Sequence, residues 1–529
     1  MLFNSYKFIL LFFPISVVAY YAIGGLGSRV QNAALVAASL AFYASWDVRF
    51  VPLLLGSIIV NFAAGRAISA CAARRRKAAA RVILAGAIAA NLLSIAIFKY
   101  AHFFVDNFNF ATGDDYALGA IILPLGISFF TFEQIGFLVD VHRGEILAPD
   151  LLDYSLFVTF FPRLVAGPIL RFHEIRPQLS AARRGPSTAE DLAVGLTIFI
   201  IGLVKKTILA DGIAPYATAA FAGAARGRPI DLFLAWGGAA AYACQLYFDF
   251  SGYSDMAIGA ARCFGIRFPM NFFSPYKATS IIEFWRRWHM TLSRFLRDYL
   301  YIGLGGNRRG AARRYANLLI TMLLGGLWHG ASWTFVLWGG LHGIYLMINH
   351  GWIAVSTRSS ILSTFRRSRA GAAFGFVVTF IAVLAGWVLF RAPNMAAAGD
   401  MLGGMIGRHG AVIPAGLAFA LEPFGGLVAA LGISYAQSSG TELVETYLWV
   451  AALLGIAFFA PTTQELLAGY HPVLEAVDGL GAAVPGPAGP RLLRWHWAPS
   501  AGSAVTVGAL AFFGIIAITR VSEFLYWQF

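Results

Sequence analysis

Charged side chains are scarce in this 529-residue sequence: Asp, Glu, Lys and Arg together make up 12% of it. Ordinary soluble domains contain about 25% charged residues, so this chain lacks the polar groups needed to cover a water-exposed surface of its size. Hydrophobic residues make up 58%, and the mean hydropathy is +0.68. The composition excludes a soluble globular protein and indicates that a lipid bilayer surrounds most of the chain.

Signatures of several other protein classes are also missing. There are only three cysteines, none with CxxC spacing, so no disulfide framework is expected. The G-x-S-x-G motif of serine nucleophiles is absent. No internal repeat is evident, which disfavours transporters built from inverted repeats. His289, His329 and His342 do not stand three or four positions apart, and no carboxylate accompanies them at motif spacing, so no metal is expected.

Apolar runs long enough to cross a bilayer, about 17–25 residues each, recur along the whole sequence. They predict an all-α, polytopic membrane protein with about eleven to thirteen membrane segments, some of them re-entrant or interfacial. The predicted segments are 6–25, 30–46, 49–70, 82–99, 117–140, 151–170, 190–212, 232–262, 315–350 (expected to hold two), 372–391, 446–464 and 503–522.

The chain is expected to form one integral membrane domain with three parts. Residues 1–115 predict simple N-terminal transmembrane helices, and residues 351–529 predict simple C-terminal ones. Residues 116–350 carry nearly all the polar and aromatic residues within the membrane and form the predicted catalytic core. The stretch near 395–440 indicates no function, and the Pro/Gly segment at 482–491 predicts a loop.

The formal net charge of +14 has an ordinary explanation in a membrane protein. Lys and Arg accumulate on cytoplasmic loops, so the charge does not require nucleic acid as a partner. The densest early cluster lies between the third and fourth predicted segments, which makes that loop cytoplasmic and places the N-terminus outside. The cluster consists of Arg74, Arg75, Arg76, Lys77 and Arg81.

The segment 281–314 predicts an amphipathic helix at the cytoplasmic interface. On a helical wheel of residues 284–299, Trp285 and other large apolar residues form one stripe, and His289 falls on that side. Four arginines form the opposite stripe: Arg286, Arg287, Arg294 and Arg297. The glycines of GLGGN, which ends at Asn307, are expected to end the helix. Simple membrane anchoring of the helix and a buried, hydrogen-bonded role for His289 remain open alternatives.

The same segment is strongly basic. Eight arginines and only one acidic residue, Asp298, occur between positions 286 and 314. Such a patch attracts a polyanionic substrate such as coenzyme A, because the phosphates match the guanidinium forks.

His329 lies in the middle of the apolar run 317–343, next to Trp328. An ionisable side chain at membrane depth is expensive and indicates a functional site. The glycines at 325, 326 and 330 allow another backbone or a substrate to approach closely. A neutral imidazole can accept a proton as a general base, whereas a histidine hydrogen-bonded between helices is the structural alternative. The structural interpretation is favoured for His342.

Two aspartates, Asp249 and Asp255, lie inside the apolar run 242–266, with Tyr253 between them. Buried carboxylates need partners, and the arginines or histidines are candidates. These residues either line a polar tunnel or make structural hydrogen bonds between helices. The full set of candidate lining residues is Asp249, Tyr253, Asp255, Trp285, Arg286, Arg297, Asn307 and Trp328.

At these residues the sequence resembles the membrane-bound O-acyltransferase (MBOAT) family, in particular its bacterial branch that serves alginate O-acetylation. The matching segments are LPLGISFFTFEQIGFLVDVHRGE (123–145), FFPRLVAGPILR (160–171), QLYFDFSGYSDMAIG (245–259), NFFSPYKATSIIEFWRRWHMTLSRFLRDYLYIGLGGNRRG (271–310), LLGGLWHGASWTFVLWGGLHG (323–343), GWVLFRAPN (386–394) and RVSEFLYWQF (520–529). The resemblance implies that His329 is catalytic and His289 its companion. It also implies a ring of helices around a central catalytic tunnel.

The resemblance further implies an enzyme of the bacterial inner membrane without a bound cofactor. Acetyl-CoA in the cytoplasm would be the acyl donor, and extracytoplasmic partner proteins would acetylate a polysaccharide. Alginate, another exopolysaccharide, cellulose and peptidoglycan remain possible acceptors, and D-alanyl transfer is a further chemistry of the family. Outside the enzyme class, a polysaccharide transporter and a non-catalytic scaffold remain open.

Overall fold

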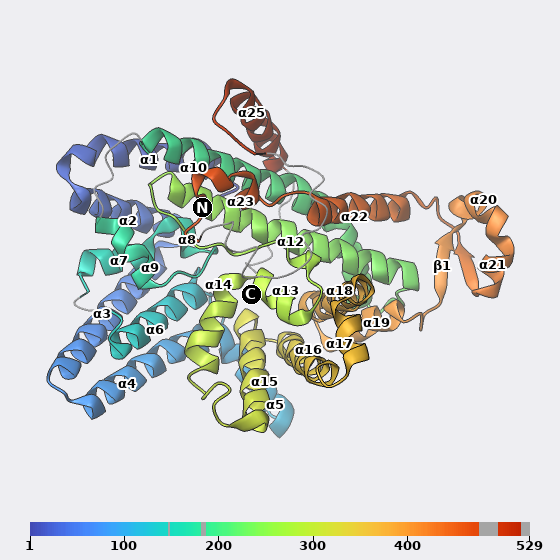
Figure 1. Cartoon of the computed structure of the whole chain (residues 1–529), viewed down its shortest axis with the longest axis horizontal. Helices are drawn as coiled ribbons and strands as arrows, with labels where there is room; N and C mark the ends of the chain where they lie inside the picture. The colour runs from blue at the N-terminus through green and yellow to red at the C-terminus, as the bar shows by residue number, and fades with distance from the viewer. Residues whose placement is uncertain (147–148, 181–186, 476–495, 520–529) are drawn as a thin grey trace.

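The computed structural model describes residues 1–146, 149–180, 187–475 and 496–519, and most of them are helical (Figure 1). The β-structure among these residues is one parallel pair of short strands, β1 (Ala411–Pro414) and β2 (Ile433–Ala436). The predicted all-α class is confirmed. The expected loop at 482–491 and the terminal segment 520–529 lie outside the described residues.

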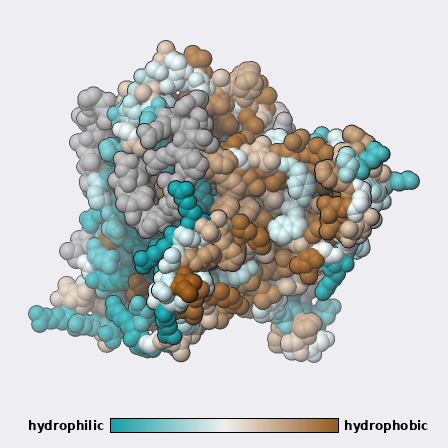
Figure 2. Space-filling view, turned by 45° about the vertical axis from the view of Figure 1, so that its right-hand side comes forward, coloured by the Kyte–Doolittle hydropathy of each residue, from teal (hydrophilic) through white to brown (hydrophobic). Residues whose placement is uncertain are grey.

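Six helices within the described ranges are long and apolar enough to cross a membrane. Two shorter apolar helices, Ala415–Ala430 and Ala501–Ile516, accompany them. Figure 2 shows a broad hydrophobic surface on the outside of the molecule, where a bilayer replaces water as the solvent. The chain is therefore a multi-pass membrane protein. The six helices are Lys7–Leu26, Val48–Ala73, Lys77–Thr112, Thr188–Ala225, Arg369–Arg391 and Thr441–Phe459.

This number is below the eleven to thirteen segments expected from apolar runs. The run 117–140 becomes helical only at Ile127, and the run 151–170 breaks at Phe160, whose backbone leaves the helical region (ψ 108°) just before Pro162. Pro162 then lies in the first turn of α8, where a proline is tolerated because the backbone N–H that it lacks would have no partner there. The run 232–262 is one long helix, but it carries charged residues in its interior.

The helices fall into three groups along the chain. The first group is α1 (Phe13–Ala22), α2 (Ser28–Ala44), α3 (Val51–Ala73), α4 (Lys77–Ile95), the π-helix η4 (Ala96–Tyr100) and α5 (Ala101–Thr112). The second is α6 (Ile127–Arg143), α7 (Leu151–Thr159), α8 (Phe161–Leu164), α9 (Phe172–Ser180), α10 (Ser187–Val204), η5 (Lys205–Ala210), α11 (Asp211–Ala225), α12 (Leu232–Arg262), α13 (Ile281–Arg287), α14 (Met290–Phe295), η7 (Leu296–Tyr301), α15 (Gly310–His329) and α16 (Trp333–Ser356). The third is α17 (Ser360–Arg367), α18 (Arg369–Arg391), α19 (Met395–Met405), α20 (Ala418–Leu421), α21 (Gly425–Ala430), α22 (Thr441–Phe459), α23 (Thr463–Leu466) and α25 (Ala501–Ile516).

Helix α12 runs through the centre of the molecule, and every residue from Gly237 to Arg262 is buried (Figure 1). Helices α10, α11, α18, α19 and α22 pack around it. Its contact with α10 depends on glycine: a Cβ on Gly252 would lie 2.7 Å from the Gly202 carbonyl oxygen, and one on Gly202 would lie 2.5 Å from the Gly252 oxygen. Small residues at such crossings let two backbones approach closely in a membrane.

Helices α15 and α16 form a hairpin. A Cβ on Gly326 would lie 2.3 Å from the Phe335 carbonyl oxygen, and one on Gly339 would lie 2.2 Å from that of Met322. The expectation that glycines before His329 permit close approach of another backbone is confirmed at Gly326. The two helices are therefore locked together next to the turn that follows His329.

The stretch near 395–440, for which the sequence indicates no function, contains α19 and the strand pair. Strand β1 pairs with β2 from Ala411 opposite Ile433 to Pro414 opposite Ala436, and α20 and α21 connect them. This unit projects at one end of the molecule, beyond α19 and α22 (Figure 1).

Candidate active site

The helix expected over residues 284–299 is broken at His289. Helix α13 ends at Arg287, Trp288 is extended, and His289 has a left-handed backbone (φ 43°, ψ 54°) before α14 begins at Met290. A non-glycine residue in this region costs of order 1–3 kcal/mol and persists only where the surroundings enforce it. The continuous amphipathic helix was therefore a wrong prediction, and the break turns His289 inward, where only 1% of it is exposed.

Asn271, in the segment between α12 and α13, holds the break in place. Its carbonyl oxygen accepts the Met290 N–H at 2.9 Å, and its side-chain Oδ1 lies 3.1 Å from His289 Nδ1. The same Oδ1 accepts the Thr291 hydroxyl at 2.9 Å and the Thr291 backbone N–H at 3.4 Å. Because a backbone N–H can only donate, this atom acts as an oxygen acceptor. His289 then carries its proton on Nδ1, and its Nε2 is a hydrogen-bond acceptor.

His329 lies at the end of a helix and not in the middle of a membrane-spanning one. Helix α15 ends at this residue, Gly330 is extended (φ −168°, ψ 155°), and the Ser332 side chain accepts the Thr334 N–H to start α16. The prediction of one continuous run around His329 was wrong, although two helices were expected within 315–350. The turn after His329 could not be recognised from the apolar composition, because Gly330 and Ser332 are its only local sequence signals.

Aromatic rings surround the imidazole of His329. The ring centroid of Trp328 lies 4.9 Å away, and those of Trp338 and Phe390 each lie 5.1 Å away. Trp328 also lies 6.4 Å from the ring of His289, so one indole contacts both histidines. The structure thus brings His289, His329 and Trp328 together, and His329 is 5% exposed.

Trp285 and His342, two further residues singled out in the sequence, pack beside this cluster. Trp285 packs edge-on against Trp338 at 5.8 Å, and Trp338 in turn contacts His329. Trp285 also packs against His342 at 5.3 Å, which is completely buried among aromatic rings.

The two predicted aspartates form ion pairs with lysines of η5. Asp249 lies 2.5 Å from Lys206 Nζ, and Lys206 also binds Asp211 at 2.8 Å. Asp255 binds Lys205 at 2.6 Å, and the side chains of α23 complete its shell. Those contacts are Thr463 Oγ1 at 2.6 Å and Gln464 Nε2 at 2.7 Å. Satisfied pairs of this kind support the structural interpretation of these carboxylates.

Asp255 also lines a small cavity that reaches the neighbourhood of Asn271. The cavity measures about 10 Å³, room for about one water molecule. Tyr253, by contrast, packs its ring on Phe3 at 4.8 Å. The cavity lining includes Lys205, Tyr247, Ser251, Ser254, Asp255, Asn271 and Phe272.

The predicted arginine stripe is only partly exposed. Arg286 and Arg297 are exposed, and Arg297 forms an ion pair with Asp298 at 2.6 Å. Arg287 is buried and binds Glu283 at 2.8 Å, so its placement on the exposed stripe was wrong. The reason is the i, i+4 ion pair with Glu283 within α13, which offsets the cost of burying the guanidinium group. Asn307 lies exposed in the turn after η7.

Lys99 also contacts the site, although no role was predicted for it. Its ammonium group donates to the carbonyl oxygens of Trp328 at 2.5 Å and His329 at 3.3 Å. The neighbouring Tyr100 hydroxyl donates to the Leu327 carbonyl oxygen at 2.7 Å. The available signal was a lysine inside an otherwise apolar segment, which is a reason to look for a partner within the membrane.

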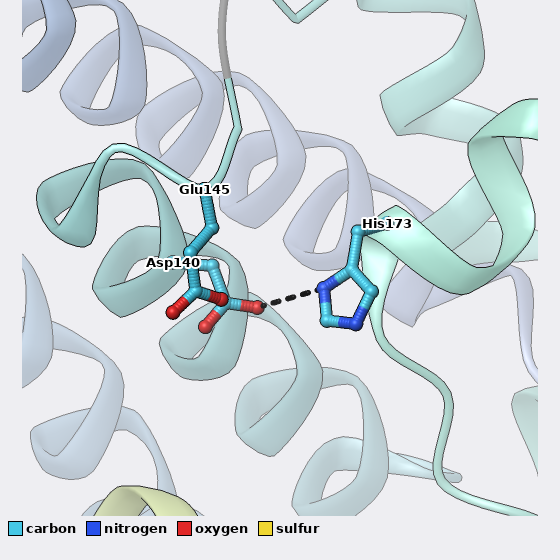
Figure 3. A group of neighbouring side chains, drawn as sticks. All are labelled: Asp140, Glu145 and His173. Carbon is cyan, nitrogen blue, oxygen red and sulfur yellow. Dashed lines mark ion pairs between the residues drawn. The ribbon is translucent and has the colours of Figure 1, made fainter.

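One group of side chains among the described residues has an arrangement that could hold a metal ion: Asp140, Glu145 and His173 (Figure 3). Their ligand atoms lie within 4.8 Å of one another. The Tyr299 hydroxyl already lies 2.8 Å from both Asp140 oxygens, and Arg143 lies 4.0 Å from one of them. The Asp140 carboxylate, 3.6 Å from His173 Nδ1, raises the pKa of His173. These contacts connect α6, α9 and η7 without an ion.

Comparison with known proteins places these observations in a family. The model of MBOAT, the membrane-bound O-acyltransferase family, matches residues 143–391, a range that contains both histidines. The probable alginate O-acetylase AlgI of Pseudomonas syringae pv. tomato is 43% identical over 412 residues, which cover 77% of this chain and 75% of the relative. The peptidoglycan O-acetyltransferase of Helicobacter pylori is 39% identical over 437 residues, covering 78% and 80%.

A more distant relative carries a different acyl group in its name. The teichoic acid D-alanyltransferase of Streptococcus thermophilus is 28% identical over 280 residues, which cover 50% of this chain and 68% of the relative. The multi-pass helical fold and these relatives define a membrane-embedded enzyme. The chain belongs to the membrane-bound O-acyltransferase family, and it is an O-acyltransferase.

Proposed function

We propose that this protein takes an acetyl group from cytoplasmic acetyl-CoA and passes it across the membrane toward an extracytoplasmic polysaccharide, with His329 as the general base. The single observation that carries the proposal is the convergence of His329 and His289 on Trp328, from two separate helical segments. Two imidazoles gathered at a helix end and a helix break, away from bulk water, are suited to proton transfer. The matched relatives supply the acyl chemistry.

His329 removes the proton from the acceptor hydroxyl as its oxygen attacks the thioester carbonyl. The C–O bond forms, the C–S bond breaks, and the imidazolium returns its proton to the coenzyme A thiolate. His289 presents Nε2 as an acceptor, because Asn271 fixes its proton on Nδ1. Polarising the thioester carbonyl would require a donor. An acceptor Nε2 is suited instead to hold a second donor group of the acceptor molecule, because the reacting hydroxyl gives its one proton to His329.

Access to His329 requires side chains to move. With 5% of the residue exposed and three aromatic rings packed around it, a thioester can enter only when Trp328, Trp338 or Phe390 turns aside. In this proposal the rings open and close the passage by which the donor reaches His329. Closing it excludes water, which strengthens electrostatic interactions in the site and limits hydrolysis of the donor.

Exposed arginines of the basic segment 286–314 would bind the phosphates of the donor. Arg286, Arg308, Arg309 and Arg313 are exposed, and the turn that contains Asn307 lies among them in the sequence. Guanidinium groups match phosphate oxygens in a bidentate geometry. Neutralising these arginines is expected to raise the KM for acetyl-CoA while kcat changes little, because they act on binding.

The orientation follows from the basic turn between α3 and α4. Arg74, Arg75 and Arg76 are all exposed and separate two candidate membrane-spanning helices. We place this turn in the cytoplasm and the N-terminus outside, in the bacterial inner membrane. The donor then approaches from the side of the basic turn, and the partner proteins act on the opposite side.

The acceptor is a polysaccharide of the alginate type or peptidoglycan, as the names of the relatives at 43% and 39% identity indicate. D-alanyl transfer has weaker support, because that relative matches only 50% of the chain. A transporter would give saturable flux without acetyl-CoA. A non-catalytic scaffold would support acetylation even when both histidines are replaced.

The test is acetyl transfer from labelled acetyl-CoA by the purified protein with its partner proteins. We expect His329→Ala to lower the rate by about 10²–10⁴, the usual contribution of a general base. The exposed His102 on α5 provides a matched control, and His102→Ala is expected to keep the wild-type rate. Equal rates for His329→Ala and wild type would contradict the proposed role of His329.

A further inference from the structure

Lys99 and Tyr100 lie in a π-helical turn. Within the continuous helical segment Lys77–Thr112, residues Ala96–Tyr100 form η4, between α4 and α5. A π-turn is wider than an α-turn, so consecutive side chains point more nearly in one direction, and such turns occur frequently at functional sites. Here both side chains contact the same partner, the C-terminal end of α15.

Three consecutive carbonyl oxygens at that end accept hydrogen bonds from this turn. Tyr100 Oη donates to Leu327 at 2.7 Å, and Lys99 Nζ donates to Trp328 at 2.5 Å and to His329 at 3.3 Å. The last carbonyls of a helix have no partner within the helix, and the negative end of the helix dipole attracts a cation. Lys99 also lies 3.4 Å from Ser128 Oγ, which connects the cap to α6.

We propose that Lys99, together with Tyr100, is a positioning residue that holds the end of α15 so that the His329 imidazole meets the reacting atoms. The inference rests on the proposed function of His329. The cation binds the carbonyl of the histidine itself, so moving it moves the backbone from which the imidazole projects. Because Gly330 is extended, the helix does not continue beyond this point and the final turn depends on contacts from outside.

A merely structural cap would behave differently. Removal of a structural lysine lowers the amount of folded protein but leaves the turnover of each folded molecule unchanged. A displacement of about 1 Å at a catalytic group, in contrast, lowers the rate by on the order of 10²-fold. In the proposed mechanism the exposed arginines bind the donor and this contact does not, so the KM for acetyl-CoA should not change.

The experiment measures kcat and KM for acetyl transfer from labelled acetyl-CoA by the folded fraction of the full chain with its partner proteins. We expect Lys99→Met to lower kcat by roughly 10²-fold with KM within about twofold of wild type. Lys99→Arg keeps a cation with N–H donors and should restore kcat to within roughly tenfold. Lys77→Met, at an exposed lysine of the same helical segment, is the control and should match wild type.

Tyr100→Phe provides a milder second variant, because it removes only one hydroxyl. We expect it to lower kcat by roughly 3–10-fold at constant KM. If Lys99→Met folds and has the kcat of wild type, the inference is wrong. If Lys99→Met does not fold, a wild-type kcat in Tyr100→Phe would overturn the inference instead. If either result is found while His329→Ala is inactive, only this inference is contradicted. A wild-type rate for His329→Ala would contradict the proposed function itself.

Discussion

Lys206 and Lys99 are both lysines inside apolar helical segments, but they have different kinds of partner. Lys206 is completely buried between the carboxylates of Asp211 and Asp249. Lys99 is half-buried, and its hydrogen-bond acceptors in the described part of the chain are neutral oxygens. The comparison separates a lysine that joins helices through opposite charges from one that organises the end of the helix carrying His329.

The largest expected effect concerns the stability of the Lys206 group. Lys206→Met leaves two buried carboxylates without their cation, and breaking a buried pair in this way costs about 3–5 kcal/mol. We expect a strongly lowered unfolding temperature in detergent, and the double variant Lys206→Met/Asp249→Asn should recover part of the loss. Lys77→Met is the control at an exposed site. Equal stability of Lys206→Met and wild type would remove the distinction between the two lysines.

Asn271 extends the comparison to a neutral side chain, which positions the candidate catalytic residue His289. Asn271→Ala removes the acceptor for His289 Nδ1 and Thr291, which leaves buried donors without a partner. Such a loss is worth about 1–3 kcal/mol, or roughly 5–150-fold in kcat if the His289 ring is released. Asn271→Asp keeps the acceptor oxygen and should retain more activity than the alanine variant. Identical kcat for wild type and Asn271→Ala would show that the orientation of His289 is not needed.

The smallest effect is expected at the ion pair of His173 and Asp140, outside the membrane-spanning helices. The neighbouring Asp140 carboxylate raises the pKa of His173. The contribution of this pair is therefore complete below the ordinary histidine pKa of about 6.5, and it disappears as the pH rises through the raised value. His173 is 39% exposed, so the contribution is only roughly 0.2–1 kcal/mol.

Thermal unfolding of wild type and His173→Phe measures this contribution. We expect wild type to have the higher unfolding temperature near pH 5.5, which is about one unit below the ordinary histidine pKa of about 6.5. The two unfolding temperatures should converge near pH 9, roughly 2.5 units above that pKa, because the histidine is then neutral. His471→Phe, at an exposed histidine, serves as the control. A difference that grows with increasing pH would have the wrong sign for this pair.

Composition was sufficient to predict the helical membrane fold, because a bilayer leaves few structures that satisfy the backbone. The number of membrane segments was less predictable. Hydropathy does not show where the backbone breaks, as at Phe160 before Pro162, or that α12 buries Asp249 and Asp255 inside the protein. Segments that face other helices tolerate turns and charges that lipid would exclude.

The histidines were predictable, but their surroundings were not. An imidazole within an apolar run is visible in the sequence, whereas the left-handed backbone of His289 depends on Asn271, which lies 18 positions away. The Lys99 contact joins residues 229 positions apart in the chain, and no local pattern encodes it. The sequence pattern thus selected the candidate histidines, and tertiary packing determined which residues hold them.

The most direct test of the central claim compares wild type and His329→Gln in a single turnover with labelled acetyl-CoA, with donor binding measured on the same samples. Glutamine keeps hydrogen-bonding capacity but cannot act as a base at neutral pH. We predict unchanged affinity for acetyl-CoA and an acetyl-transfer rate lower by about 10²–10⁴. Transfer at the wild-type rate by His329→Gln would contradict the account.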